Sequence, residues 1–245
     1  MISNKESKFI KSLQLKKFRK LENKFLVEGA KNVLELLKSD LKIDQLFGTE
    51  AFLNQYSSDT HSYDFREVTE RELSKVGSLT TNNAALAVVE IPDVEKPDLQ
   101  QSLLGFDRVK DPGNLGTIIR IADWYGFRHI ICSSDSVDCY NPKVVSATMG
   151  SFARVRVIYD DLSDWIAQFP NSYGATLNGG DIHQVKFEEP AFLVFGNEST
   201  GISEDLIDQL GQEVKIPAYG GAESLNVAVS TAVFCDNFKR SLKGQ

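Results

Sequence analysis

The stretch FLVFGNESTGIS, residues 192–203, leads from an unbroken apolar run through a glycine-containing loop toward the start of a helix. Such an apolar run is typical of a strand that is covered on both faces, as in a parallel sheet. Two other stretches repeat this pattern of glycine and small polar residues: DPGNLGTIIR at residues 111–120 and IPAYGGAESLNVAVSTAV at residues 216–233. Strands that alternate with helices predict an α/β fold with a mostly parallel sheet.

The rest of the C-terminal half continues this alternation. We expect strands at Leu103–Asp107, His129–Cys132, Arg154–Ile158, Tyr173–Leu177, Phe192–Phe195 and Val214–Ile216. We expect helices at about Gly116–Tyr125, Pro142–Met149, Leu162–Gln168, Ser203–Gln209 and Leu225–Ser241.

The N-terminal part predicts a second, smaller α/β unit that ends near Ile91. A short strand at Phe25–Glu28 precedes a helix at about Ala30–Lys38. The runs IDQLFGT, SYDFREV and ALAVVEI are typical of strands, and ERELSKV is typical of a short helix. The next ten residues contain two prolines and little apolar content, which indicates a linker. The predicted organisation is therefore a first domain at residues 1–92, a linker at 93–101 and a second domain at 102–245.

The composition is that of a folded protein in a reducing compartment. Of the 245 residues, 42% are hydrophobic and 25% are charged, which excludes a disordered, fibrous or disulfide-stapled chain. Cys132, Cys139 and Cys235 are too few and too scattered for a disulfide framework or a four-ligand zinc site. The first residues lack the features of a signal peptide, and no apolar run approaches the roughly 20 residues that span a bilayer. We expect a cytoplasmic protein with no membrane partner and no metal.

Charge is spread unevenly along the chain, whose net charge is −7. Residues 1–42 contain 11 Lys or Arg and 5 Asp or Glu, and apolar residues lie between these charges. The segment is either a solvated amphipathic helix or a surface that binds phosphates without regard to sequence. As RNA-contacting candidates we take Lys16, Lys17, Arg19 and Lys20.

The three glycine-containing stretches are candidates for a ligand site, because ligands of such sheets bind outside the carboxyl ends of the strands. None of the three contains a dinucleotide or P-loop fingerprint, which argues against a nucleotide-cofactor oxidoreductase. Arg120 and Glu198 each allow two interpretations, an ordinary surface ion pair or a group directed into a cleft. Asn226 has amide atoms that need partners if the side chain is buried. The three histidines belong to no recognisable motif, and we interpret them as structural.

Taken together, the three stretches resemble the three motifs of the SpoU (TrmH-like) family of SPOUT-class RNA ribose methyltransferases. Residues 114–120, NLGTIIR, resemble motif 1, and residues 195–201, FGNESTG, resemble motif 2. Motif 3 is represented by IP at residues 216–217 and by SLNVAV at residues 224–229. The N-terminal unit, with FLVEG and SLTTNNAALAVVEIP, is similar to the L30e-like substrate-binding domain of the ribosomal RNA members.

This resemblance implies a fold, a donor and an assembly. The C-terminal domain would contain a deep trefoil knot, although threaded chains are otherwise very rare. The methyl donor would be S-adenosylmethionine, and the protein would form a homodimer through its C-terminal domain.

The resemblance also implies roles for individual residues. Arg120 would be the central catalytic residue, either as the base or as a cation that stabilises the developing alkoxide. Asn114 and Glu198 would orient Arg120 and the ribose, and Ser224 and Asn226 would hold the substrate or the motif. Cofactor-binding roles fall on Leu177, Asn178, Gly196, Asn197, Ile216, Pro217 and Leu225.

The function that follows is methylation of a ribose 2′-hydroxyl in RNA. The N-terminal domain favours ribosomal RNA over transfer RNA as the substrate. A non-catalytic RNA-binding protein of ribosome assembly is the alternative from another class, against which the intact Arg120, Glu198 and Asn226 argue. A carboxylate at Glu223 near the RNA cleft is unusual for an RNA-binding surface.

Overall fold

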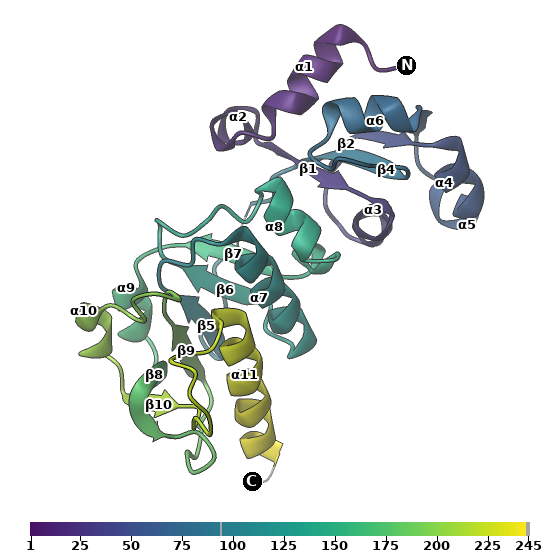
Figure 1. The fold of residues 1–245 in the computed structure, drawn as a ribbon. Helices are drawn as coiled ribbons and strands as arrows, with labels where there is room; N and C mark the ends of the chain where they lie inside the picture. The colour runs from purple at the N-terminus through teal and green to yellow at the C-terminus, as the bar shows by residue number, and fades with distance from the viewer. Residues whose placement is uncertain (94, 244–245) are drawn as a thin grey trace. The chain divides into compact units, whose positions relative to one another are not determined.

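The structure is a computed structural model that describes residues 1–93 and 95–243, and its contacts divide the chain into two units (Figure 1). The first unit combines Met1–Asp93 with Asp138–Arg154. The second consists of the described parts of Val94–Val137 and Val155–Gln245. Among the described residues, no helix is both long and apolar enough to cross a membrane.

The first unit is an α/β sandwich around a four-stranded mixed sheet. Its strand order is β1-β4-β2-β3, with β4 antiparallel to both neighbours and β3 parallel to β2. The elements before the linker are α1 (Asn4–Ser12), α2 (Lys16–Glu22), β1 (Lys24–Glu28), α3 (Ala30–Leu37), β2 (Ile43–Gly48), α4 (Glu50–Gln55), α5 (Ser57–Thr60), β3 (Phe65–Glu67), α6 (Glu70–Val76) and β4 (Ala85–Glu90).

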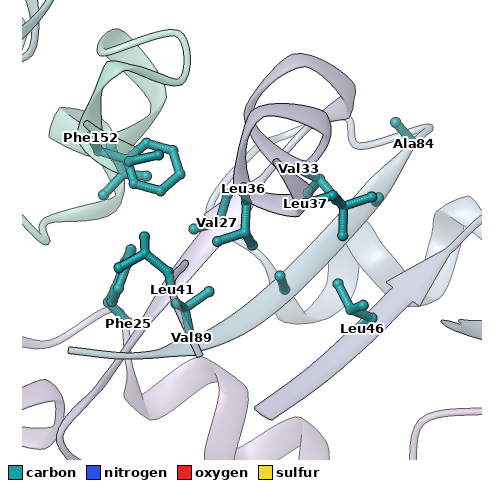
Figure 2. Packing of buried hydrophobic residues seen from close by; sticks show 14 of the residues in the cluster. Phe25, Val27, Val33, Leu36, Leu37, Leu41, Leu46, Ala84, Val89 and Phe152 are labelled. Carbon is teal, nitrogen blue, oxygen red and sulfur yellow. The ribbon is translucent and has the colours of Figure 1, made fainter. Parts of the chain in front are cut away.

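Side chains that alternate along β1 and β4 build a core on each face of this sheet. On one face, Phe25, Val27 and Val89 pack with Val33 and Leu36 of α3 (Figure 2). The other face is covered by a cluster to which α1 and α6 contribute, made of Ile10, Leu13, Leu26, Phe47, Val68, Leu73, Val76, Leu86 and Val88. This alternation is why the short apolar runs in the sequence form strands.

The predicted second domain at residues 102–245 needs a correction at Asp138–Arg154. This segment contains α8 (Pro142–Ala147) and the short helix η1 (Ser151–Ala153), and it belongs to the first unit. Its side chains Val145 and Phe152 join the core on the α3 face, as Figure 2 shows for Phe152. Val145 and Phe152 are therefore buried in the core of the first unit, although the segment lies between strands of the second unit in the sequence.

The second unit is built around a six-stranded parallel sheet with the order β10-β8-β9-β5-β6-β7. The α/β fold and the mostly parallel sheet are thus confirmed. Its elements are β5 (Leu103–Phe106), α7 (Pro112–Trp124), β6 (His129–Cys132), β7 (Arg156–Tyr159), α9 (Leu162–Ile166), β8 (Asn171–Asp181), β9 (Ala191–Phe195), α10 (Glu204–Ile207), β10 (Gln212–Lys215) and α11 (Val227–Lys243).

Helices cover both faces of this sheet, as the unbroken apolar runs predict. Leu103, Phe192 and Val194 point to a core that includes residues of α9 and α10. On the opposite face, Phe195 meets Phe234 of α11, with ring centroids 5.3 Å apart. Helix α7 begins at Pro112, earlier than predicted, because Asp111 caps it and proline is well suited to a first helical turn.

Candidate functional site

The three motif loops lie at the same edge of the parallel sheet. They follow β5, β9 and β10, which together with β8 are consecutive strands in the sheet order. Because these strands are parallel, their carboxyl ends meet at one edge, and the loops after them lie close together. The sheet topology therefore gathers three stretches that are far apart in the sequence.

A cavity of roughly 770 Å³ opens between strand β8 and the loops that follow β9 and β10. This volume is within the range of small-molecule and cofactor sites. The cavity is lined by every residue predicted to bind the cofactor: Leu177, Asn178, Gly196, Asn197, Ile216, Pro217 and Leu225. The sequence does not show that these residues line one cavity, because they lie in three separate segments of the chain.

The loop after β9 is closed on itself and depends on a glycine at its base. Asn197 and Gly201 exchange two backbone hydrogen bonds, of 3.0 and 2.8 Å. A Cβ atom on Gly196 would lie 1.9 Å from the carbonyl carbon of Gly201, which no side chain can tolerate. Gly196 is therefore required for the chain to pass close to itself beside the cavity.

One residue from each motif contributes to a connected polar network. Asn114 Nδ2 donates to a carboxylate oxygen of Glu198, and Asn226 Nδ2 donates to Asn114 Oδ1 over 2.8 Å. Asn226 Oδ1 accepts from the backbone N–H of Ala228 over 2.9 Å in the first turn of α11. Every amide orientation is thus fixed by a partner, and the Glu198 carboxylate is held beside the start of α7.

The structure does not bring Arg120 into this network. Arg120 is exposed on α7, and within the described residues no hydrogen bond or ion pair links it to Asn114 or Glu198. It follows Asn114 by six positions, which places it about 120° away around the helix. Ser224 is exposed and lines the cavity, but it makes no contact with the polar network among the described residues.

Thr176 and Tyr219 are among the cavity-lining residues that sequence reasoning missed. The hydroxyl of Thr176 is buried and has no hydrogen-bond partner among the described residues. Its position directly before Leu177 in the strand was a signal that could have identified it. The backbone of Pro217–Leu225 likewise makes no hydrogen bond within the described part of the chain.

The basic N-terminal segment separates into exposed and buried charges. Lys16, Lys17 and Lys20 are exposed on α2, so they can contact phosphates. Arg19 is only 2% exposed, and its guanidinium binds Asp138 in the same unit. The prediction that Arg19 contacts RNA is therefore wrong, because a cation enclosed by its own partners cannot reach a phosphate.

Comparisons with known proteins agree with this geometry. The SpoU rRNA Methylase family model matches residues 101–236, and the MRM3-like substrate binding domain model matches residues 4–87. The 23S rRNA (guanosine(2553)-2′-O)-methyltransferase RlmP of Bacillus subtilis is 32% identical over 235 residues, which is 94% of each chain.

Two solved structures superpose over nearly the whole chain. A protein of the TrmH family from Porphyromonas gingivalis is 37% identical, with a TM-score of 0.88 over 98% of this chain and 99% of its own. An AdoMet-bound rRNA methyltransferase from Sinorhizobium meliloti is 29% identical, with a TM-score of 0.85 over 99% and 97% of the two chains.

Proposed function

This chain belongs to the SpoU rRNA methylase family, and on that basis we propose that its cavity binds S-adenosylmethionine beside the Asn114–Glu198–Asn226 network. The protein is an S-adenosylmethionine-dependent methyltransferase that acts on a ribose 2′-hydroxyl of ribosomal RNA. The observation that carries the proposal for the site is that all seven predicted cofactor residues line one cavity.

The residues of the cavity fit this cofactor. Apolar side chains such as Leu177, Ile216 and Leu225 offer a slot for a flat base, and the free backbone of Pro217–Leu225 offers donors and acceptors. The unpartnered Thr176 hydroxyl supplies one more polar contact. When bound, the cofactor supplies an electrophilic methyl group.

The chain's own groups orient the acceptor and handle its proton. We assign the polar network to holding the ribose, since the Glu198 carboxylate is fixed at one orientation by Asn114. Arg120 stabilises the developing alkoxide through the positive charge of its guanidinium. Ser224 lies at the cavity and contacts the RNA.

Arg120 lies outside the polar network of its own chain, so we propose a homodimer through the second unit, in which Arg120 serves the site of the partner chain. The exposed face of α7 carries Thr117, Arg120 and Trp124, and Trp124 is 84% exposed. A second chain over this face would remove the apolar surface of Trp124 from water. The same unit is proposed to contain the deep trefoil knot of the family.

RNA docking is assigned to the first unit. Lys16, Lys17 and Lys20 supply sequence-independent affinity for phosphates, and the rest of this unit selects the target. Reversing these three charges should lower the affinity for RNA and flatten its dependence on salt. Unchanged RNA affinity and unchanged salt dependence would refute the assignment of RNA docking to these lysines. We propose a cytoplasmic location, in keeping with the bacterial ribosomal RNA methyltransferase that the chain resembles.

The test is transfer of labelled methyl from S-adenosylmethionine to RNA from a strain that lacks this gene. Ribosomal and transfer RNA are separated afterwards, and Arg120→Ala is compared with Arg128→Ala, a control at another exposed arginine of the same unit. We expect label in ribosomal RNA, lost in Arg120→Ala and kept in the control. Label in transfer RNA alone would show that transfer RNA, not ribosomal RNA, is the substrate. Cofactor binding without label in any RNA or ribosomal particle would favour a non-catalytic protein.

A further inference from the structure

Arg108 has a backbone conformation that its residue type does not favour. It lies between β5 and α7 with φ at +55°, one of three non-glycine residues with positive φ among the described residues. Glycine adopts this region freely, whereas a side chain crowds the backbone there. Strained residues of this kind often lie at functional sites, where the side chain contributes something that glycine lacks.

The Arg108 guanidinium is held against a buried carboxylate. Its Nε and Nη2 donate to Asp107 over 3.1 and 3.0 Å, and Asp107 is only 4% exposed. The same carboxylate accepts from the backbone N–H of Ser203 over 2.9 Å, just before α10. Asp107 therefore connects Arg108 to the far end of the loop that follows β9.

The backbone of Arg108 is attached to the near end of that loop. Its carbonyl accepts from Asn197 Nδ2 over 2.8 Å, and its N–H donates to Ser133 Oγ over 2.8 Å. Nη2 also approaches the Gly201 carbonyl, at 3.5 Å. The pair of Asp107 and Arg108 thus contacts the loop at its start, at its end and just beyond it.

This loop carries Glu198, the carboxylate that binds Asn114. We infer that Asp107 and Arg108 are a positioning pair that holds the Glu198 loop against the start of α7, and that they set the rate of methyl transfer rather than cofactor affinity. The inference rests on the proposed function of the Glu198 network. Cofactor affinity is separate because Asn197 and Gly201 close the loop by their own backbone bonds.

The test replaces Arg108 with glycine, which keeps the left-handed backbone and removes the guanidinium. Met149→Gly is the matched control, because Met149 also has positive φ, at +52°, and lies in the first unit. We expect Arg108→Gly to lower kcat about tenfold to a hundredfold through misplacement of Glu198. The dissociation constant for S-adenosylhomocysteine, measured by calorimetry, should stay within about threefold, a difference of less than 1 kcal/mol.

Added guanidinium at low millimolar concentration should restore part of the lost rate in Arg108→Gly and have no effect on the wild type. Met149→Gly should keep both kcat and the dissociation constant. A wild-type kcat in Arg108→Gly would overturn the inference, and so would a parallel loss of cofactor affinity.

A second measurement separates this inference from the proposed function. Hydrogen exchange of residues 197–203 should speed up in Arg108→Gly and stay unchanged in Met149→Gly, whether or not any RNA is methylated. If the wild type transfers no methyl group, the proposed function has failed, while faster exchange would still support the positioning pair. Unchanged exchange would overturn it.

Discussion

Replacing Arg19 with alanine should destabilise the first unit without affecting how the folded protein binds RNA. The guanidinium is enclosed by partners within this unit. Nη2 and Nε lie 2.5 and 3.0 Å from Asp138 Oδ2, and Nη1 donates to the carbonyls of Leu13 and Gln14 over 2.9 Å each. The substitution removes all four contacts at once and leaves one carboxylate oxygen, Asp138 Oδ2, and two carbonyls without their donor.

The size of the effect follows from burial. Removing one partner of a buried ion pair costs about 3–5 kcal/mol, because the remaining charge is left uncompensated. The side chain of Arg19 is 2% exposed, whereas that of Asp138 is 15% exposed and keeps some contact with water. The lower end of the range applies, so we expect a loss of about 3 kcal/mol in the free energy of unfolding.

Urea unfolding followed by circular dichroism measures this loss, with Lys20→Ala as the control on the exposed side of the same helix. The control should change stability by no more than about 0.5 kcal/mol, as exposed positions usually do. RNA binding under native conditions should show the opposite pattern, with a weaker salt dependence in Lys20→Ala alone. If Arg19→Ala were as stable as the wild type but bound RNA with a weaker salt dependence, the assignment of Arg19 to the core would be refuted.

Three further outcomes follow from the second unit. Gly196→Ala should raise the dissociation constant for S-adenosylhomocysteine more than about tenfold, because its Cβ would overlap backbone and overpacking costs about 1–3 kcal/mol. The control is Gly180→Ala in β8, whose Cβ would lie 3.9 Å from Gln212 Nε2 and which does not line the cavity; it should bind normally in the same calorimetric assay. Thr176→Val should stabilise the ligand-free protein against urea by about 1 kcal/mol, because the substitution removes a buried hydroxyl that has no partner. It should also weaken cofactor binding about fivefold, and weakened binding without stabilisation would contradict this account. Burial raises the pKa of the Cys235 thiol to about 12, so iodoacetamide at pH 8.5 should label Cys235 only after unfolding, and rapid labelling of the native protein would show that α11 opens.

The predicted strands and helices of the second unit all have counterparts in the structure, because their patterns are local. The run at residues 192–195 becomes the buried strand β9, and the periodic stretch at residues 116–125 lies within or next to α7. The three motifs also identified the family, which the family model confirms. The helices α4 and α5 went unpredicted, since each is a few residues long and carries little periodicity.

Local patterns failed where a side chain's partner lies far along the chain. Arg19 and Lys20 are adjacent cations in the sequence, yet one is buried and the other is exposed. The difference depends on Asp138, which is 119 positions away from Arg19. The same limit applies to Asp138–Arg154, whose apolar residues complete the core of the first unit although they lie between strands of the second.

The candidate site shows the same division between sequence and tertiary structure. By itself the sequence determined the residue types, the glycine positions and the membership of a family, since each of these is written in contiguous motifs. Only the tertiary structure decided that Asn114, Glu198 and Asn226 form one hydrogen-bonded network and that Arg120 lies outside it. It also decided that Arg108, unremarkable in the sequence, holds the Glu198 loop. The physical reason is that hydrogen bonds and burial depend on which strand ends become neighbours, and the order of strands in a parallel sheet is not their order in the chain.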